Sequence, residues 1–351
     1  MPREWARAKR TLENREVPIL PTKRLIVVCL ILLSVPIALL GFASRSASPG
    51  AVPGQEAPEA RAHHQLVYHP GEQRALLFGG STPRDAGHHF FDDIWSWGDG
   101  RWRRVASLPF PRSSHRLVYD AGRDRLVLFG GGHGSSFAAD SSFWEWDGRA
   151  WSMAGVSPHG GMAEPGMCYD SSRSRTVLFG GWNGAGEFTG ETWEWTGEEL
   201  VRFAVPGPAP RGGHAFVYDP QGRRCLLFGG RSNEGVLADT WAWDGTAWLQ
   251  LQASGPTARW ISATATDHVN QRVILFSGWD EDEVLQRDTW SWDGERWERI
   301  SLEGPPARIS GQLAFDGSGV LLFGGRTRTA EGFQDLNDTW ELRGRMWFPL
   351  R

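Results

Sequence analysis

Lysine, cysteine and tyrosine are all scarce in this 351-residue sequence, and each scarcity limits the roles that these residue types can have in the fold and in a functional site. Lysine occurs only at Lys9 and Lys23, so almost every strong base is an arginine. The three cysteines, Cys29, Cys168 and Cys225, are too few for a disulfide framework. The last two fall in predicted strands, where cysteine behaves as a small buried residue. The four tyrosines share one repeated strand position, so we interpret them as packing residues.

The charge balance argues against a nucleic-acid partner. From Arg61 onward the chain has 29 arginines against 36 acidic residues, a net charge of −7. Nucleic-acid-binding domains normally carry a basic footprint. The sequence also lacks a hydrolase nucleophile motif, a phosphate-binding loop and a HExxH helix. We therefore assign no catalytic residue, no cofactor and no metal ligand from motifs.

One long hydrophobic run lies near the N-terminus. Residues 25–43 carry no charge, and as a helix they would nearly cross a hydrocarbon core of ~30 Å. Basic residues outnumber acidic ones in residues 1–24, so the positive-inside rule keeps this tail in the cytoplasm. A cleaved signal peptide is the alternative, because the Gly-Phe-Ala that ends the run is typical of a cleavage site. The long basic tail favours an uncleaved anchor.

These features predict a single-pass protein of a bacterial-style cytoplasmic membrane. Residues 44–60 are small, polar and proline-rich, as linkers are. Residues 61–351 would then lie outside the membrane, in the periplasm or the extracellular space, or would be secreted if the segment is cleaved. The membrane is contacted only through the N-terminal helix.

The rest of the chain is a sixfold internal repeat. An apolar stretch ending in Phe-Gly-Gly returns every 47–51 residues, with Ser277 breaking the glycine pair of the fifth copy. A Trp-x-Trp motif follows each stretch, in the degenerate form Trp340-x-Leu342 in the sixth copy. Another tryptophan stands five residues later, replaced by Leu200 in the third copy. These positions hold 16 of the 20 tryptophans, so the repeat is not a chance pattern.

Each copy predicts four short strands. In the second copy these are HRLVYD, RLVLFG, SFWEW and a strand that begins at Trp151. Asp147-Gly148 between the last two is typical of a tight hairpin turn with positive φ. A period of about 49 residues matches the Kelch repeat of about 50, whereas WD-type repeats run about 40–45.

At these positions, over nearly all of residues 61–350, the sequence resembles the Kelch-repeat family. The resemblance implies an all-β fold, a six-bladed propeller with four antiparallel strands per blade, preceded here by one N-terminal transmembrane or signal helix. The expected blades are residues 61–109, 110–160, 161–209, 210–257, 258–306 and 307–351. Each is contiguous in sequence, so we expect the ring to close by packing between blades and not by strand exchange.

Some Kelch-type propellers are enzymes, and this chain departs from the two classes considered. Galactose oxidase-like members need copper, a tyrosine cross-linked to cysteine and paired histidines, and no cysteine here is placed to form the cross-link. The catalytic residues of periplasmic sialic-acid epimerases cannot be mapped onto this sequence. Glu164, His159 and His133 are possible acids or bases. Nothing in the sequence brings them together.

The connections between strands two and three, and between blades, are long and variable, and they share one face of the propeller. Binding tends to lie on such loops. The candidate ligand-face residues are Trp182, Trp260, Trp279, His88, His133 and Arg231. Capping of the sheet ends is the alternative for the three tryptophans. The acidic run 280–283 is interpreted as a solvated loop in preference to a calcium site. His64, His115 and His214 are interpreted as packing residues in preference to a zinc site.

An arginine opens strand one in five blades, and an acid stands two residues before Trp-x-Trp in five. Met162 and Ser142 are the two exceptions. We predict ion pairs between each arginine and the acid of the preceding blade, a structural role in preference to ligand binding. The predicted pairs are Arg61–Asp338, Arg112–Asp93, Arg211–Glu191, Arg259–Asp239 and Arg308–Asp288.

The sequence thus favours an extracytoplasmic binding or scaffold module over an enzyme. Its expected partner is a protein or a cell-envelope glycan, recognised through the long-loop face. The alternative is a carbohydrate-active enzyme, such as a sugar epimerase, with its site at the mouth of the central channel.

Overall fold

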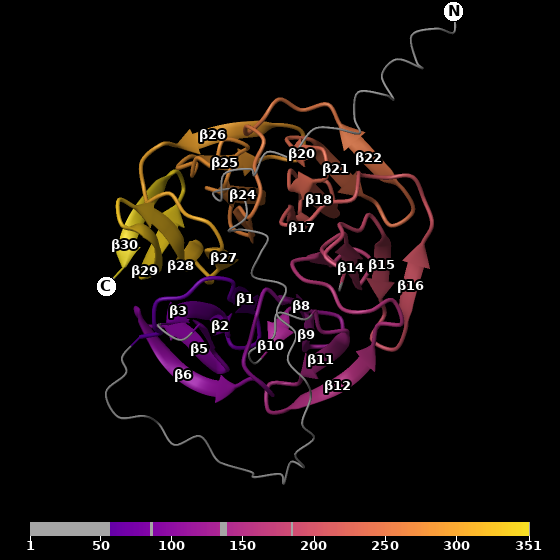
Figure 1. The fold of residues 1–351 in the computed structure, drawn as a ribbon, viewed down its shortest axis with the longest axis horizontal. Helices are drawn as coiled ribbons and strands as arrows, with labels where there is room; N and C mark the ends of the chain where they lie inside the picture. Colours follow the sequence, from indigo (N-terminus) through magenta and orange to yellow (C-terminus); the bar gives the residue numbers. More distant parts are fainter. Residues whose placement is uncertain (1–56, 85–86, 134–138, 184, 351) are drawn as a thin grey trace, which may run out of the picture. The chain divides into compact units, whose positions relative to one another are not determined.

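The computed structural model describes residues 57–84, 87–133, 139–183 and 185–350. They form six four-stranded antiparallel sheets arranged as blades around a central axis (Figure 1). The predicted all-β, six-bladed architecture with four strands per blade is therefore confirmed. Within these ranges, no helix is long and apolar enough to cross a membrane. The predicted tail 1–24 and hydrophobic segment 25–43 lie outside the described residues.

In each of the first three blades the four strands pair in the order in which they occur along the chain. Blade one consists of β1 (Gln65–His69), β2 (Arg74–Phe78), β5 (Asp93–Gly98) and β6 (Arg101–Ser107). Blade two consists of β8 (Arg116–Asp120), β9 (Arg125–Phe129), β11 (Ser142–Trp146) and β12 (Trp151–Val156). Blade three consists of β13 (Gly166–Asp170), β14 (Arg175–Phe179), β15 (Thr192–Trp195) and β16 (Leu200–Phe203).

The last three blades repeat this order. Blade four consists of β17 (Ala215–Asp219), β18 (Arg224–Phe228), β21 (Thr240–Trp243) and β22 (Trp248–Leu251). Blade five consists of β23 (Ala263–Asp267), β24 (Arg272–Phe276), β25 (Thr289–Trp292) and β26 (Trp297–Ser301). Blade six consists of β27 (Gln312–Phe315), β28 (Val320–Thr329), β29 (Gly332–Arg343) and β30 (Met346–Leu350).

Three short antiparallel pairs lie between strands two and three or at the start of a blade. They are β3 (Ser81–Arg84) with β4 (Gly87–Phe90), β7 (Arg112–Ser113) with β10 (Gly132–His133), and β19 (Arg231–Ser232) with β20 (Gly235–Val236). In blade six the pairing of β28 with β29 continues to Thr329 and Gly332, so this loop is a long hairpin. The loop face is therefore partly built from hydrogen-bonded strands, which makes it more rigid than open loops.

Strand one lies innermost and strand two carries the core. The first strand of each blade contacts the first strand of the next blade around the axis; these strands are β1, β8, β13, β17, β23 and β27. In blades one to five, strand two is buried at every residue except its first. Aromatic side chains fill the space between blades. Phe143 of blade two, for example, stacks on Trp195 of blade three with ring centroids 4.5 Å apart.

The second glycine of the Phe-Gly-Gly motif is explained by a close approach of two chain segments. Gly80 has a φ of 101°, and a Cβ on it would lie 2.8 Å from the Cβ of His64. Gly230 repeats this against His214, at 2.7 Å. No side chain fits there, and positive φ favours glycine in any case. The histidines before strand one thus pack against a glycine, as the packing interpretation expects.

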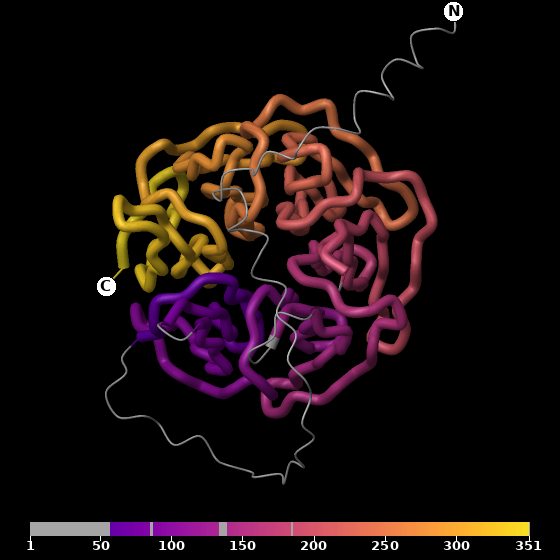
Figure 2. The backbone as a smooth tube through the Cα atoms, viewed as in Figure 1, coloured from indigo at the N-terminus to yellow at the C-terminus, as the bar shows by residue number. Residues whose placement is uncertain are grey.

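The ring closes where blade six meets blade one, the yellow and indigo ends of the described chain (Figure 2). The Arg61 N–H donates to the Leu336 carbonyl at 3.1 Å, and the Gly325 N–H donates to the Arg61 carbonyl at 2.8 Å. The Trp102 indole N–H donates to Thr339 Oγ1 at 3.0 Å. Within the described residues, β30 is the outermost strand of blade six.

Candidate functional site: the long-loop face and the channel mouth

The arginines that were predicted to open strand one stand four residues before it. They pair with acids of their own blades, so the predicted pairing between neighbouring blades is wrong. Arg211 illustrates the arrangement: Nη1 and Nη2 lie 2.5 and 2.9 Å from the two carboxylate oxygens of Asp239. The same Nη1 donates to the Gly229 carbonyl at the end of strand two. The five observed pairs are Arg61–Asp93, Arg112–Asp140, Arg211–Asp239, Arg259–Asp288 and Arg308–Asp338.

The reason is geometric. Strands one and three of a blade are separated only by strand two, about 10 Å in all, which an extended arginine side chain can span. The backbone of the arginine, not its side chain, contacts the preceding blade: the Gly230 N–H of blade four donates to the Arg259 carbonyl of blade five at 2.9 Å. Each arginine therefore joins two blades through its carbonyl and braces its own blade through its guanidinium group.

The two exceptions to the repeated arginine and acid, Ser142 and Met162, lie in blades two and three. In blade two, Asp140 supplies the carboxylate for Arg112, and Ser142 donates its hydroxyl to Asp140 at 2.8 Å. In blade three Met162 replaces the arginine, and Glu191 pairs instead with Arg202 at 2.8 Å.

The tryptophans of the long-loop face form one aromatic layer. Trp260 and Trp279 stack with parallel rings 5.9 Å apart, and Trp182 meets Trp260 edge-on at 6.2 Å. Trp279 also meets Phe333 of blade six edge-on at 5.7 Å. We call Trp182, Trp260, Trp279 and Phe333 the aromatic layer. Trp260 and Trp279 are each only 6% exposed, so the idea that they are exposed stacking platforms is contradicted. Phe333 is 47% exposed.

The other predicted ligand-face residues are dispersed over this face. Arg231 is exposed in β19, with its guanidinium carbon 5.3 Å from the Trp260 ring centroid. His88 lies in β4, and burial together with the charge of Arg326 lowers its pKa. His133 lies in β10, where its backbone pairs with Arg112. The structure therefore brings Arg231 to the aromatic layer, leaves His88 in the β3–β4 hairpin of blade one, and leaves His133 in the short β7–β10 pair.

Residues of the acidic run 280–283 accept hydrogen bonds on the long-loop face. Asp280 accepts backbone hydrogen bonds from Asp282 at 3.1 Å and Val284 at 2.8 Å. Glu281 accepts from the Val236 N–H of the neighbouring blade at 2.7 Å. Across the residues that the structure describes, no group of three or more histidine, cysteine, aspartate or glutamate side chains is placed to hold a metal ion.

A narrow ring encircles the channel at its mouth on this face. It is formed by the residue two positions after the arginine, or after Met162 in blade three, and every member has a φ between 49° and 62°. In five of the six steps, each member's N–H donates to the carbonyl of the preceding member, as in Ser114 to His63 at 3.0 Å. We call this set the mouth ring; its members are His63, Ser114, Glu164, Gly213, Ile261 and Ser310.

Side chains of the mouth ring meet over a small pocket. His63 Nδ1 lies 3.2 Å from Glu164 Oε1, and His63 Nε2 lies 3.5 Å from Ser310 Oγ. Arg116 and Gln312 also line this pocket. Burial alone would raise the pKa of Glu164, but the hydrogen bond and charge of His63 and the charge of Arg116 lower it. The carboxylate is therefore ionised beside the imidazole.

Among the acid–base candidates, Glu164 lines this pocket. The ring of His159 packs on Trp193 at 4.1 Å. Sequence reasoning missed His63 and Ser310, although both share a repeat position with Glu164. The histidines one position further on are buried, and burial lowers their pKa, to about 3 for His64. We call these the inner histidines: His64, His115 and His214.

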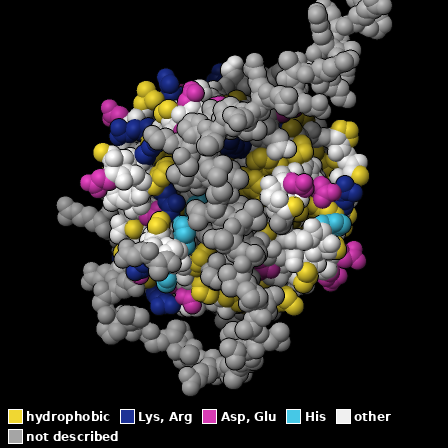
Figure 3. All heavy atoms as spheres, in the orientation of Figure 1, with side chains coloured by type: hydrophobic (Ala, Val, Ile, Leu, Met, Phe, Trp, Pro, Cys, Tyr) yellow, Lys and Arg dark blue, Asp and Glu magenta, His cyan; other side chains and the backbone are white. Residues whose placement is uncertain are grey.

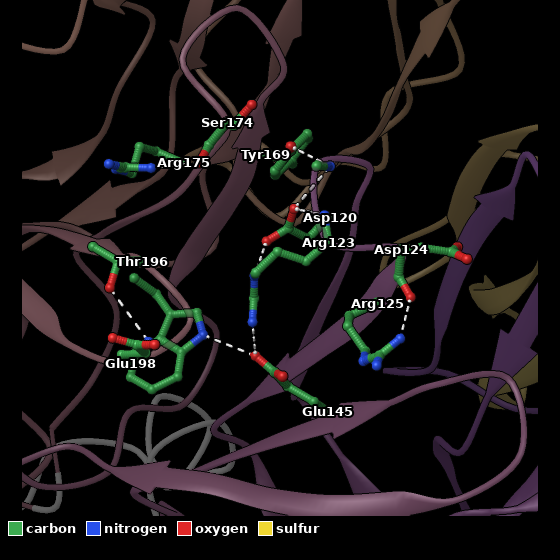
Figure 4. Close-up of polar contacts among 12 residues, drawn as sticks. Asp120, Arg123, Asp124, Arg125, Glu145, Tyr169, Ser174, Arg175, Thr196 and Glu198 are labelled. Atoms are coloured by element: carbon green, nitrogen blue, oxygen red, sulfur yellow. Dashed lines mark hydrogen bonds and ion pairs between the residues drawn. The ribbon is translucent and has the colours of Figure 1, made fainter.

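The opposite, turn-bearing side carries further polar contacts between blades. Within blade two, Arg123 pairs with Asp120 and Glu145, each at 2.7 Å (Figure 4). Glu145 also accepts from the indole N–H of Trp195 in blade three, at 3.2 Å. Trp243 donates in the same way to Glu194 of blade three at 2.9 Å. These contacts occupy the inner positions of Trp-x-Trp and were not predicted.

Comparison with known proteins gives a match to repeats of the same type. A family model described as the KLHDC2/KLHL20/DRC7 Kelch-repeats domain matches residues 173–347, about half of the chain. The chain is also similar to Mei4-dependent protein 6 of Schizosaccharomyces pombe, with 31% identity over 97 residues. That similarity covers 25% of this chain and 13% of the yeast protein.

Proposed function

We propose that this chain, a Kelch-repeat propeller by its fold and its family match, is a binding module that engages a protein partner through the long-loop face. The observation that carries the proposal is the aromatic layer, in which buried indoles hold an exposed phenylalanine at the surface. Such rigid aromatic anchors beside arginine are typical of the residues that dominate binding energy at protein interfaces.

Three features of the layer support this proposal. Phe333 projects from the β28–β29 hairpin with 47% of its surface exposed, and its ring rests edge-on against Trp279. Val284 is 53% exposed beside the same layer, next to Leu285, which packs into it. Arg231 lies at the edge of the layer over Trp260.

The loops that present these side chains are tied to one another. The Glu281 carboxylate links the loop of blade five to the β19–β20 hairpin of blade four. Asp335 pairs with Arg326 at 2.6 Å across the blade-six hairpin. Preorganised loops lose little conformational entropy on binding, which favours affinity. Where Figure 3 shows described residues, charges of both signs are interspersed with hydrophobic side chains.

A site-specific photo-cross-linker in the full chain tests the proposal. Placed at Phe333 in cells of the source organism, it is expected to capture one protein reproducibly, and the purified pair should bind with a measurable Kd. Val284→Glu should weaken that binding at least ~10-fold, since it introduces a charge at the interface. The matched control is Val269→Glu, which alters a residue of the same blade that is 60% exposed in the opposite, strand-one–strand-two turn.

Equal loss of affinity in both variants would contradict the assignment of the face. A glycan array run with the same proteins separates the other class of ligand. Glycan binding that Val284→Glu removes and Val269→Glu spares would replace the protein partner with an envelope glycan.

The proposed location is outside the cytoplasmic membrane, held by residues 25–43. This proposal rests on the charge and hydropathy pattern of the N-terminal sequence. Protease added to intact cells or spheroplasts should digest the propeller, and carbonate extraction should leave the chain in the membrane fraction. Full protection from protease would contradict it.

A further inference from the structure

The mouth ring brings together three side chains that no sequence motif connects. His63 comes from the start of blade one, Glu164 from blade three and Ser310 from blade six. Because all three occupy the same repeat position, the propeller places them on one small circle around the channel. The histidine stands between the other two, with its two ring nitrogens facing different partners.

The chemistry of the partners fixes the roles of the two nitrogens. An ionised carboxylate can only accept a hydrogen bond, so in a neutral His63 the proton lies on Nδ1, facing Glu164. Nε2 is then left as an acceptor for the Ser310 hydroxyl. A serine bonded to a base that is itself oriented by a carboxylate is the arrangement of an activated nucleophile, recognised by geometry and not by chain order. The Oγ–Nε2 separation of 3.5 Å is long, as such bonds often are in the absence of substrate.

Hydrogen-bond donors are available in the same pocket. Gly213 is the one mouth-ring member whose N–H has no hydrogen-bond partner among the described residues, and it lines the pocket. The Gln312 side-chain amide lines it too. Charge developing on a carbonyl oxygen needs such donors, each worth about 10²–10³ in rate where the geometry is right.

We propose that Ser310 is a nucleophile for acyl transfer from small esters, with His63 as its general base and Glu164 as a positioning residue. Ser310 Oγ attacks the ester carbonyl while its proton moves to His63 Nε2. The carbonyl–alkoxy bond then breaks, and His63 returns the proton to the departing alcohol. Water, deprotonated by His63, releases the acyl group as a carboxylate and restores Ser310. The narrow pocket limits the acyl group to a short one. This activity is independent of binding at the aromatic layer.

Active-site labelling of the purified full chain in mild detergent tests the proposal. A fluorophosphonate probe is expected to modify Ser310, located by peptide mass spectrometry, and heat-denatured protein should not react. The informative variant is Ser310→Gly, because Ser310 has a φ of 54° and the equivalent position of blade four is the naturally occurring Gly213. It should fold with an unchanged Tm and lose all labelling. The control Ser262→Ala removes another pocket-lining hydroxyl and should keep the labelling.

Hydrolysis of p-nitrophenyl acetate gives the second readout. His63→Asn is expected to lower kcat at least ~100-fold, the usual contribution of a general base. Glu164→Gln is expected to lower kcat by a similar factor with KM changed less than about twofold, a split that a purely structural role would not produce. Absence of labelling in the folded protein, labelling at another residue, or hydrolysis that survives Ser310→Gly would overturn the proposal.

Discussion

A single isosteric substitution at the junction of blades six and one tests how the ring is held closed. Trp102 of blade one is 5% exposed, and its indole N–H donates to Thr339 Oγ1 of blade six at 3.0 Å. Thr339 is itself 6% exposed. Thr339→Val keeps the shape of the side chain and creates no cavity, but it leaves a buried N–H without an acceptor. An unsatisfied buried donor costs about 1–3 kcal/mol.

The assay is urea denaturation followed by tryptophan fluorescence, with thermal melting as a check. We expect Thr339→Val to lower the free energy of unfolding by about 2 kcal/mol, with a Tm lower by ~4–8 °C for a domain of this size. The same bond recurs inside the ring, where Trp297 donates to Thr240 at 3.1 Å, so Thr240→Val should cost a similar amount. A double-mutant cycle with Trp102→Phe isolates the hydrogen bond from changes in packing.

Two other junctions between blades lack this tryptophan–threonine hydrogen bond. At the junction of blades one and two, Ile94 stands in the threonine position, and the Trp151 N–H has no partner among the described residues. At the next junction Phe143 takes that position and Leu200 replaces the donor tryptophan. A Thr339→Val protein as stable as the parent, with no coupling in the cycle, would refute the view that these bonds contribute to closure.

Three further predictions concern stability. Glu194→Ala removes the acceptor of Trp243 and one partner of Arg173, so urea denaturation should show a loss of about 3 kcal/mol, whereas Ala at the exposed Glu198 should change little. Ser277→Ala removes the hydroxyl that accepts the Arg308 N–H at 2.8 Å; the expected cost is about 1–2 kcal/mol, and an unchanged midpoint would contradict this. The inner histidines have pKa values lowered by burial, so the unfolded chain binds more protons below pH 6.5, and stability should fall as the pH falls from about 6.5. The slope, measured by denaturation at several pH values, should be roughly 1 kcal/mol per pH unit for each histidine, and His→Gln variants should flatten it.

The blade count and strand order could be predicted because they follow from local rules repeated six times. Phe-Gly-Gly marks the end of a buried strand, and Trp-x-Trp marks the next strand, so the spacing of the two fixes four strands per repeat. The pairing of the arginines could not be settled in the same way. Arg211 has acids on the same face in two blades, Glu191 and Asp239, and the sequence alone does not say which one the side chain reaches. Counting strands would have favoured Asp239, two strands away in the same sheet.

The burial of the loop tryptophans could not be predicted from the sequence, for a different reason. Trp260 and Trp279 each open a loop, which suggests exposure, but an isolated backbone bridge places them opposite each other and their rings stack. The junction contact of Glu145 was not evident either, because this residue resembles a surface residue of a strand. In the structure, Arg123 of its own blade pairs with it and Trp195 of the neighbouring blade donates a hydrogen bond to it. The mouth ring did leave a signal: aligning the repeats two positions after the arginine places His63, Glu164 and Ser310 in one column.

The backbone energies of the mouth ring distinguish a position that serves the scaffold from one that is free to serve a function. The left-handed backbone of the mouth ring costs a residue other than glycine roughly 1 kcal/mol or more, and Gly213 shows that glycine fits the same circle. Five of the six members nevertheless carry side chains. The backbone bonds of the ring do not need those side chains, since they run from N–H to carbonyl. The arginine position, by contrast, serves the scaffold and is nearly uniform, whereas the mouth ring holds five different residue types. A strained position that varies around a symmetric scaffold is where a site can be built at little risk to the fold. His63, Glu164 and Ser310 are the members that meet one another, so a reactive site in this propeller is expected at the channel mouth.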